Sequence, residues 1–506
     1  MKEAIKSTWE KHPLAVIMAA GFLFRLLAII FSKGYGMHDD HFLVIEPAQK
    51  WADGQCDWLP SGGAQGPEGH SLFYWGVHGF LFLFLKWIGM TDPQSKMYIV
   101  RAIHALWSML TIYYGYKIAE RFGGRKAANQ AGLILALLFF FPMFSVRNLV
   151  EMACIPPLVI GTWLMIDPAH KDRLTAYVWS GLLFGISFDI RFQSILFIGG
   201  AGLVLLFQRE WKKLFTFSLA SLIPILSIQL AADMVVWKRP FAEFEQYIMY
   251  NVINIHNYPQ GGWYAYFLLI GGILIPPVSI FLFFGYMRSW KKFPMLFLPA
   301  FIFLLVHSFI SNKQERFILP VIPFIIILGS IGWNDYVSSS AFWRSHAKLL
   351  KGCWIFFWVL NGIALPVVST MYSKRSRVES MTWLSKQRDV HGIIIETGNT
   401  YNTIQMPLYY INNWKIVIEN VNKEHTLQSV YDSYKENPDT LIHPNYVIFL
   451  GKDHLPERVD SFRKIFPQTT FCCEISSGFM DKLMEWLNPV NKNQNAYIYR
   501  FSESKN

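Results

Sequence analysis

The sequence predicts a mainly α-helical, polytopic membrane protein that ends in a small extramembrane α/β domain. The chain of 506 residues is 53% hydrophobic. Only 16% of its residues are charged, against about 25% in soluble domains. Long apolar runs recur from residue 14 to residue 371, at lengths that suit membrane helices.

The apolar runs define about 11 membrane spans. Residues 71–90 are also apolar, but His78 and Lys86 interrupt them, and their membrane status decides the side of every later connection. The approximate ranges of the spans are 14–32, 98–117, 127–144, 150–166, 175–190, 192–208, 214–235, 264–287, 294–311, 317–333 and 351–371.

Basic residues assign the two sides of the membrane, because Lys and Arg are enriched in cytoplasmic connections. If residues 71–90 do not span, the connections rich in Lys and Arg all face the cytoplasm. If they do span, clusters such as Arg288, Lys291 and Lys292 face the wrong way. We therefore expect 71–90 to be interfacial or re-entrant, the N-terminus to be cytoplasmic and residues 33–97 to form a long first outer loop.

The composition changes after residue 371, which predicts a domain boundary. Residues 1–371 form the membrane domain, and residues 372–506 form an α/β domain on the outer, periplasmic or lumenal side. In the second domain charges return, and a helical stretch at 456–465 alternates with short β-like runs. These runs lie at 392–396, 414–418, 446–450 and 496–500.

The formal charge of +11 does not indicate a nucleic-acid partner. The basic residues sit in short clusters between apolar runs, as expected of membrane connections, and no basic stripe is interleaved with aromatic residues. The five cysteines show no metal-ligand spacing. The lipid bilayer is the partner that the composition implies.

An acidic motif follows the first apolar run directly. Residues 37–42 read Met-His-Asp-Asp-His-Phe, and Glu46 comes just after them. Adjacent carboxylates at the mouth of a membrane helix are costly to place, so Asp39 and Asp40 are candidate catalytic groups. A solvated loop or helix cap is the alternative interpretation, and metal binding by the acids and histidines of the motif is another.

Other polar residues fall on the same predicted side, although each comes from a separate turn. This convergence indicates an active site. A carboxylate there can act as general base on a sugar hydroxyl, while Arg and Lys neutralise a phosphate leaving group. The pattern suits glycosyl transfer from a lipid phosphate donor. The residues concerned are Arg147, Glu151, Asp189, Arg191, Gln193, Lys313, Gln314, Glu315 and Arg316.

Structural roles compete with this hypothesis at several of these positions. Arg147 and Glu151 have the spacing of an i,i+4 ion pair. Arg191 has the position of a side chain that extends to the membrane interface. Lys313 and Arg316 are also placed to anchor a helix end at the interface.

These motifs resemble glycosyltransferase family 22, the Alg9-like mannosyltransferases with the GT-C fold, and within it the GPI-anchor mannosyltransferase branch. Residues 37–42 stand where that family has an Asn-Pro-Asp-Glu-aromatic-Trp-like motif. Residues 312–323 (Asn-Lys-Gln-Glu-Arg-Phe-Ile-Leu-Pro-Val-Ile-Pro) match its His-Lys-Glu-x-Arg-Phe-x-x-Pro-x-x-Pro motif. Residues 191–193 (Arg-Phe-Gln) stand where it often has Arg-Pro-Thr. The departures are His38 for Pro, Asp40 for Glu, Asn312 for His and Gln314 for Glu.

The resemblance implies an inverting glycosyltransferase that moves mannose from a polyprenyl-phosphate donor to a hydroxyl of a glycan or glycolipid acceptor on the outer face. Asp39 would be the general base, supported by Asp40. No cofactor or metal is required by this scheme, since basic residues can stabilise the leaving phosphate. The residues implied in donor phosphate binding are Lys313, Arg316 and Arg191, and those implied in acceptor binding are His41, Glu46 and Glu315.

A transporter or flippase of lipid-linked glycans is the alternative function. It would use the same outer cavity without bond formation, and an inverted repeat between the two halves of the chain would favour it. The sequence contains no such repeat. It also contains no Asn-x-Ser/Thr sequon, which favours a bacterial inner membrane over the endoplasmic reticulum.

Overall fold

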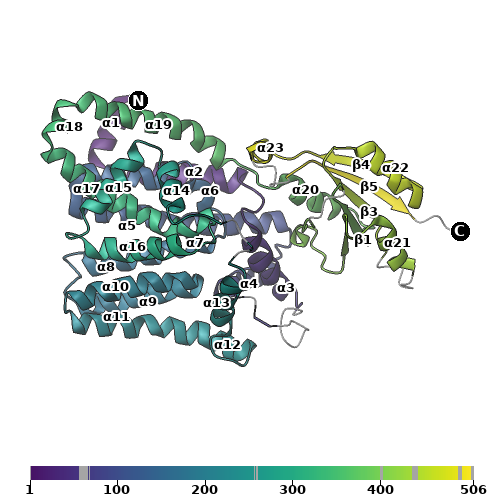
Figure 1. The fold of residues 1–506 in the computed structure, drawn as a ribbon, viewed down its shortest axis with the longest axis horizontal. Helices are drawn as coiled ribbons and strands as arrows, with labels where there is room; N and C mark the ends of the chain where they lie inside the picture. The colour runs from purple at the N-terminus through teal and green to yellow at the C-terminus, as the bar shows by residue number, and fades with distance from the viewer. Residues whose placement is uncertain are drawn as a thin grey trace. The chain divides into compact units, whose positions relative to one another are not determined.

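The computed structural model describes residues 2–55, 66–67, 69–255, 257, 260–398, 403–435, 443–487 and 493–502 (Figure 1). Part of the predicted outer loop, at 56–65 and 68, lies outside these ranges. The chain forms two compact units. The helical unit comprises Met1–Phe31, Gln55–Phe80 and Tyr98–Thr370, and the sheet unit comprises Ser32–Gly54, Leu81–Met97 and Met371–Asn506. The predicted boundary at residue 371 stays a prediction.

Most of the helical unit consists of apolar helices joined by short connections. Its α-helices are α1 (Lys2–Lys11), α2 (Pro13–Phe31), α5 (Pro93–Leu137), α6 (Phe141–Ser145), α7 (Val150–Ala153), α8 (Ile155–Ile166), α9 (Leu174–Ile190), α10 (Ile195–Phe207), α11 (Trp211–Pro224), α12 (Ala231–Val236), α13 (Ala242–Ile253), α14 (Ala265–Ile273), α15 (Val278–Arg288), α16 (Pro294–Phe309), α17 (Ile322–Ser339), α18 (Ala341–Ser345) and α19 (Ala347–Ser369). Short 3-10 or π segments connect some of them: η3 (Phe192–Ser194), η4 (Ile225–Leu230) and η5 (Glu315–Val321).

Four helical stretches of the described chain are long and apolar enough to cross a membrane, and six shorter apolar helices accompany them. The four are Pro13–Phe31, Trp211–Val236, Glu315–Ser339 and Ala347–Ser369. These stretches have the length and composition of membrane spans. The number of about 11 spans stays a prediction.

Two predicted spans have a different form in the structure. The range 264–287 is not one helix, because Ile275, Pro276 and Pro277 separate α14 from α15. Proline has no backbone N–H to donate within a helix. Neighbouring groups must therefore satisfy the backbone carbonyls that this break leaves unpaired. The range 127–144 is also interrupted, since α5 ends at Leu137 before α6 begins.

Gly124 makes the turn between two antiparallel parts of α5. Its φ of 71° and ψ of −179° lie outside the helical region. A glycine adopts this conformation without steric cost. The two parts pack against each other, since the Tyr116 hydroxyl donates to Asn129 at 3.3 Å. The connection between the predicted spans 98–117 and 127–144 is therefore a tight hairpin at Gly124, where two helices meet.

Helix α4 (Leu72–Trp87) corresponds to the ambiguous range 71–90. Its 16 residues fall short of the roughly 20 that a perpendicular span needs. Phe80, Phe84 and Trp87 are exposed by 68%, 52% and 81%, and their spacing puts them on one helix face. A stripe of exposed apolar side chains is compatible with an interfacial helix. The interfacial or re-entrant placement of 71–90 stays a prediction.

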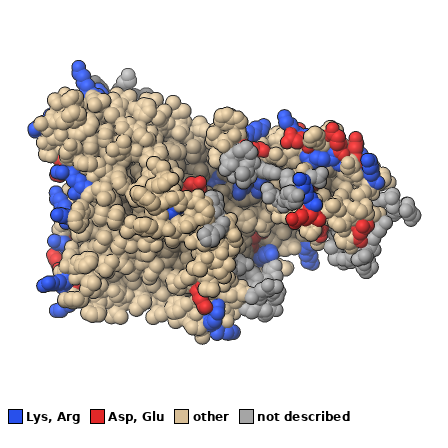
Figure 2. Space-filling view, viewed as in Figure 1, with Lys and Arg blue, Asp and Glu red and all other residues tan. Residues whose placement is uncertain are grey.

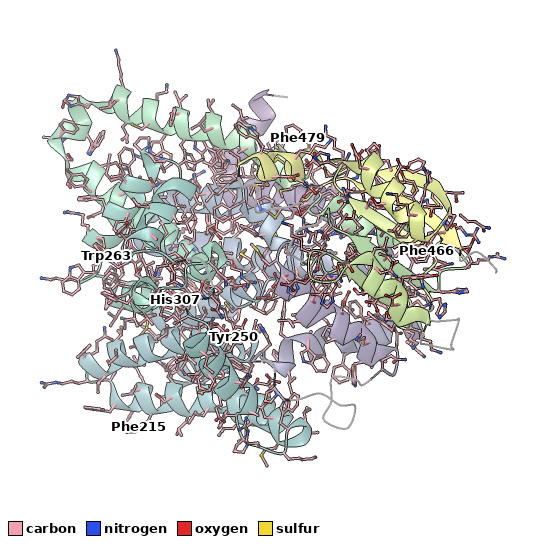
Figure 3. All side chains as sticks on the ribbon, turned by 45° about the vertical axis from the view of Figure 1, so that its right-hand side comes forward. Phe215, Tyr250, Trp263, His307, Phe466 and Phe479 are labelled. Carbon is pink, nitrogen blue, oxygen red and sulfur yellow. The ribbon has the colours of Figure 1, made fainter. Side chains whose placement is uncertain are left out.

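The surface of the helical unit reverses the usual arrangement of a soluble protein. Lys and Arg gather at the end that carries the connections 167–173, 208–210 and 289–293, and an almost uncharged surface adjoins that end (Figure 2). Phe215 and Trp263 are about two-thirds exposed, whereas His307 is buried (Figure 3). Exposed apolar and buried polar side chains are expected where lipid is the solvent.

Helices α15 and α17 approach so closely that their backbones touch. A Cβ atom on Gly332 would lie 2.1 Å from the carbonyl oxygen of Gly285, and one on Gly329 would lie 2.4 Å from that of Leu282. Small residues permit this approach, which is a common way to pack helices in membranes.

Glu243 fixes the start of α13, in the predicted connection between spans. Its carboxylate is 2% exposed and accepts hydrogen bonds from the backbone N–H groups of Gly69 at 2.7 Å and His70 at 3.1 Å. Burial raises the pKa of Glu243 to about 7.

The sheet unit is built on a five-stranded mixed sheet. Its strand order is β2-β1-β3-β5-β4, with β1, β2 and β3 parallel and β5 antiparallel to both of its neighbours. The strands are β1 (Gly392–Glu396), β2 (Val417–Val421), β3 (Tyr446–Leu450), β4 (Gln468–Ile475) and β5 (Ala496–Ser502). The other elements are η1 (Asp40–Ile45), α3 (Glu46–Ala52), α20 (Arg375–Leu384), η6 (Leu408–Tyr410), α21 (Leu427–Lys435), α22 (Leu455–Ile465) and α23 (Phe479–Leu487).

The strands β1 and β3 are buried along their whole length, as expected of central strands covered on both faces. On one face, Val430 of α21 and Phe462 of α22 join the core formed by Ile394, Val447 and Phe449. The predictions of a strand at 392–396, a strand at 446–450 and a helix at 456–465 are confirmed.

The predicted strand at 496–500 is also confirmed, since β5 spans Ala496–Ser502. Two other strands differ from the prediction. The predicted strand at 414–418 is shifted, since β2 begins at Val417. The edge strand β4 was not predicted, because its side chains carry no apolar alternation.

We expect Gly332→Ala to destabilise the helical unit, because the added Cβ clashes with backbone atoms of α15. Overpacking of this kind costs about 1–3 kcal/mol. The thermal midpoint in detergent should fall for this variant. The control is Gly362→Ala in α19, where a Cβ has no neighbour within 4 Å and the midpoint should not fall. Equal midpoints for the two variants would contradict the close packing.

We expect the stability of the helical unit to fall between about pH 4.5 and pH 7 through Glu243. The folded protein favours its protonated form, since the pKa is raised from 4.5 to about 7, so the stabilisation is complete below the lower value and is lost as pH rises through the upper one. Glu243→Gln keeps a carbonyl oxygen for Gly69 and His70. It should match wild type at pH 4 and exceed it in thermal midpoint at pH 8. Identical pH profiles for the two proteins would rule out this titration.

Candidate functional site

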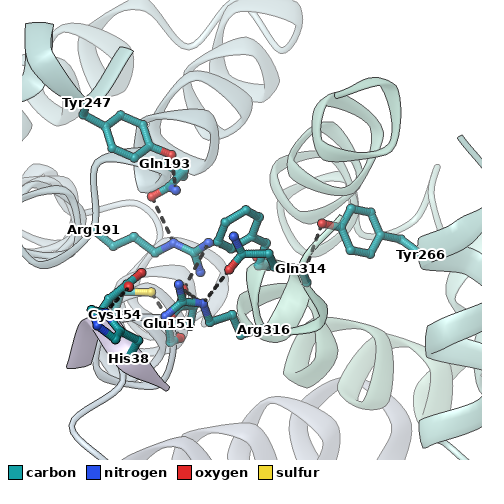
Figure 4. Close-up of polar contacts among 11 residues, drawn as sticks. His38, Glu151, Cys154, Arg191, Gln193, Tyr247, Tyr266, Gln314 and Arg316 are labelled. Carbon is teal, nitrogen blue, oxygen red and sulfur yellow. Dashed lines mark hydrogen bonds and ion pairs between the residues drawn. The ribbon is translucent and has the colours of Figure 1, made fainter. Parts of the chain in front are cut away.

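A buried cluster of charged groups lies in the helical unit, and Glu151 is its centre (Figure 4). One oxygen of this carboxylate lies 3.8 Å from Nη2 of Arg191 and 3.8 Å from Nε of Arg316. Glu151 and Arg191 are each 3% exposed and Arg316 is 9% exposed. The residues come from α7, the end of α9 and η5, so helices far apart in sequence build one polar centre.

Two guanidinium groups face the Glu151 carboxylate, and guanidinium keeps its charge in proteins. Removing an ion from water costs several kcal/mol unless the ion is paired and hydrogen-bonded. A buried pair of guanidinium groups is therefore a feature that favours an anionic ligand. Arg147, 3% exposed, lies four residues before Glu151 in the sequence.

Neutral side chains orient the two arginines. The Nε of Arg191 donates to Gln193 at 3.0 Å, and the Nε of Arg316 donates to Gln314 at 3.1 Å. Gln193 in turn donates to the hydroxyl of Tyr247 on α13 (Figure 4). Hydrogen bonds to neutral side chains thus help to hold the two guanidinium planes.

Lys313 has a different environment. Its ammonium group donates to the backbone carbonyls of His307 at 2.9 Å, Ser308 at 2.8 Å and Ile310, at the end of α16. It also lies 4.9 Å from the centre of the Tyr266 ring. Burial lowers the pKa of Lys313. The structure uses all three ammonium hydrogens to cap a helix, which favours the anchoring interpretation over phosphate binding.

Two other residues that the sequence indicated on the predicted outer side do not contact Glu151. Glu315, the first residue of η5, is exposed. Asp189 is fully buried, and neither of its carboxylate oxygens has a hydrogen-bond partner among the described residues.

The acidic motif lies in the sheet unit and adopts a π-helix, η1, that begins at Asp40. Short π segments are rare and frequently occur at functional sites. Asp40 is 4% exposed, whereas the Asp39 side chain is 37% exposed. Of the two adjacent acids, Asp39 is therefore the more exposed one.

The ring of His41 is held between aromatic side chains. It stacks on Tyr35 with centroids 4.8 Å apart and on Tyr410 with centroids 5.5 Å apart. Its Nε2 lies 3.5 Å from Glu46, and the same carboxylate accepts a hydrogen bond from the backbone N–H of Tyr409 at 3.1 Å. His41 and Glu46 are both buried. Their contacts fix the backbone of the motif against the segment around η6.

His38 stands beside Asp39. Its Nδ1 lies 3.6 Å from the Asp39 carboxylate, and its Nε2 is hydrogen-bonded to Gln405 at 2.6 Å. The hydrogen bond with Asp39 raises the pKa of His38. Asp39 thus has His38 as a polar neighbour and is partly exposed.

Basic residues that sequence reasoning missed lie near this motif. The Nζ of Lys374 lies 4.4 Å from the centre of the Tyr35 ring, and Arg377 interacts electrostatically with the Tyr35 hydroxyl. A signal was present in the sequence: Lys374, Arg375 and Arg377 follow the last apolar run, on the side where the positive-inside rule predicts few basic residues.

The metal alternative finds no support from a ligand set. Among the described residues, no group of three or more His, Cys, Asp or Glu side chains could hold a metal ion. The histidines of the motif are instead occupied by Gln405, Glu46 and aromatic rings.

Comparison with curated proteins identifies relatives of one kind. Over 395 residues the chain is 20% identical to mannosyltransferase APTG1 of Arabidopsis thaliana. The aligned region covers 72% of this chain and 69% of that protein. Over 281 residues it is 22% identical to the human α-1,2-mannosyltransferase ALG9, which covers 52% of this chain and 45% of that protein.

Among solved structures, the chain resembles ArnT from Cupriavidus metallidurans. In the apo state the TM-score is 0.62 at 15% identity, with 97% of this chain and 98% of that chain covered. For the same protein bound to undecaprenyl phosphate the TM-score is 0.58 at 14% identity, with 96% and 97% covered. At such identity the likeness concerns the fold, which is the GT-C fold of membrane glycosyltransferases.

The family model of the Alg9-like mannosyltransferases matches residues 16–393, which is most of the chain. This match includes the acidic motif and both arginines of the buried cluster. The chain therefore belongs to the Alg9-like mannosyltransferase family and is a multi-pass membrane glycosyltransferase.

Proposed function

We propose that this glycosyltransferase moves mannose from a polyprenyl-phosphate donor to a hydroxyl of a glycan or glycolipid acceptor, with inversion, on the outer face of a bacterial inner membrane. The acceptor oxygen attacks the anomeric carbon and the bond from that carbon to the phosphate oxygen breaks. The hydroxyl proton passes to a carboxylate, and polyprenyl phosphate leaves. The reaction needs no oxidant, reductant or further substrate.

The observation that carries this proposal is the pair of buried guanidinium groups on Glu151. A polyprenyl phosphate presents an anion that gains charge as the glycosidic bond breaks. Guanidinium groups match phosphate with paired N–H donors and stabilise that charge in a site from which water is excluded. Arg191 and Arg316 are the residues that we assign to the donor phosphate. ArnT, which shares the fold, has been crystallised with undecaprenyl phosphate.

Asp39 is the residue that we assign as general base. Its partial exposure gives a hydroxyl access to the carboxylate, and His38 holds one of its sides. Asp40 is buried beside it in the chain and supports the backbone geometry of the motif. A divalent metal has no assigned part in this scheme.

The other residues implied by the family resemblance receive narrower roles. His41 and Glu46 are buried and engaged with each other, so we assign them to positioning the acidic motif for the acceptor. Lys313 supports the donor site by capping α16. Glu315 is exposed next to Arg316 in the chain and stays a proposed acceptor contact.

We expect Asp39→Asn to lower mannosyl transfer by about 10²- to 10⁴-fold, since loss of a general base has effects of this size. The assay uses purified protein with a short-chain polyprenyl-phosphate mannose. The matched control is Asp92→Asn, an exposed acid of the same predicted outer loop whose side chain caps Ser95, a contact that Asn can keep. Wild-type rates for Asp39→Asn would remove the base assignment.

We expect Arg316→Gln to lower kcat/KM for the lipid donor by about 10- to 100-fold, in line with about 1.5–3 kcal/mol for a hydrogen bond to a charged group. The control is Arg121→Gln, which removes an exposed arginine that lies 3.7 Å from Asp167. Its kcat/KM should stay at the wild-type value. An equal loss in both variants would show that the Arg316 effect is not specific to the cluster.

The same cluster predicts an effect on stability. Glu151→Gln leaves two buried guanidinium groups without their carboxylate, so the thermal midpoint should fall. Combining Glu151→Gln with Arg191→Gln removes one of these charges and should recover part of the loss. A double variant less stable than Glu151→Gln alone would contradict the role of Glu151 as the balancing charge.

A further inference from the structure

A cavity of about 880 Å³ lies in the sheet unit, and none of the residues assigned to mannosyl transfer lines it. It opens at the carboxyl ends of the three parallel strands. Glu396 ends β1, Val421 ends β2 and Leu450 ends β3, and all three residues contribute to the lining. The volume lies within the range of roughly 300–1,000 Å³ that is typical of small-molecule sites.

The strand order places this cavity where parallel sheets bind ligands. The chain passes from β1 to β2 on one side of β1 and then to β3 on its other side. The connections after β1 and β3 therefore leave in opposite directions and open a crevice between them. Crevices at such switch points are the general ligand sites of open α/β sheets.

Arg458 of α22 lines the crevice and connects the ends of β1 and β3 by hydrogen bonds. Its Nε donates to the Glu396 carboxylate at 2.6 Å, and a second nitrogen donates to the same carboxylate. Further N–H groups donate to the carbonyls of Leu450 at 3.1 Å, Gly451 at 3.1 Å and Asp453 at 3.2 Å. The charges of Arg458 and Glu396 are thus paired within the protein. The Arg458 guanidinium has no pair of N–H groups left to bind a phosphate.

Around the Arg458–Glu396 ion pair, the cavity lining combines apolar surface with hydrogen-bond acceptors and donors. Leu427 supplies partly exposed apolar surface, and Phe449 and Phe462 are lining residues that are at most 1% exposed. The exposed lining includes Asp453 and Glu457, which accept hydrogen bonds only, and Ser461, which donates and accepts. Lys423 and Thr426 also belong to this lining. Sugar hydroxyls both donate and accept, while sugar C–H faces are apolar, so this combination suits a neutral carbohydrate.

We propose that this crevice is an accessory site for a neutral oligosaccharide, the glycan portion of the acceptor. The choice of a glycan rests on the proposed function, whereas the existence of a binding crevice does not. The crevice would hold part of the acceptor beyond the sugar that receives mannose. It would therefore determine which acceptors bind well without taking part in bond formation.

The test uses full-length Asp39→Asn protein in detergent, so that no transfer interferes, with mannotriose and chitotriose as probes in calorimetric titrations. Asp453→Ala combined with Glu457→Ala removes two acceptors at exposed positions. Ser461→Trp fills the crevice from its rim. The matched control is Asp460→Ala, an exposed acid on the same helix that does not line the cavity. Thermal midpoints confirm that each variant is folded.

We expect at least one probe to bind, with affinity lowered about tenfold or more by the double variant and by Ser461→Trp, and unchanged by Asp460→Ala. Binding equal in all variants, binding of neither probe, or competition by inorganic phosphate would each overturn the proposal. In the protein with Asp39 intact, the double variant should raise KM for a long glycan acceptor and leave kcat for a short one unchanged. Transfer by Asp39→Asn would refute the base assignment and leave this binding result standing.

Discussion

The carboxylate of Glu151 is the contact on which the polar centre of the helical unit depends. It lies 3.8 Å from two buried guanidinium groups, one on Arg191 and one on Arg316. Such charges are tolerated only when they are paired and hydrogen-bonded, so the positions of α7, the end of α9 and η5 are coupled through this one group. The two guanidinium groups that this carboxylate holds are also the ones that we assign to the donor phosphate. Structure and proposed function thus rest on the same contacts.

The acidic motif shows a second way of placing a charged group. Asp39 is partly exposed, and its position is set by its buried neighbours: His41 stacks between Tyr35 and Tyr410, and Glu46 accepts from the backbone of Tyr409. These contacts lie within the sheet unit, which joins residues near position 40 to residues near position 410. These aromatic contacts hold the motif next to Asp39, and the proposed role of Asp39 as general base needs such positioning.

Much of the fold could be predicted because membrane helices and central strands carry strong local signals. Apolar runs marked α2, α16 and α17, and the continuous runs of β1 and β3 marked strands that are buried on both faces. The break between α14 and α15 could not be predicted from its apolar run, since prolines are tolerated in membrane helices when neighbours compensate. The edge strand β4 was not predicted because its mixed polar and apolar residues carry no clear strand pattern. Its strand conformation depends on pairing with β5.

The sequence by itself determined that the chain enters a membrane. It also determined that carboxylates follow the first apolar run and that a basic motif precedes one of the last apolar runs. These are local properties of composition and spacing. Only the tertiary structure decided which polar residues meet. It placed Arg191 and Arg316 on Glu151, turned Lys313 into a helix cap, and brought the ends of β1 and β3 together at Arg458. The physical reason is that burial and pairing are long-range properties: the energy of a charge depends on neighbours that the chain supplies from distant positions.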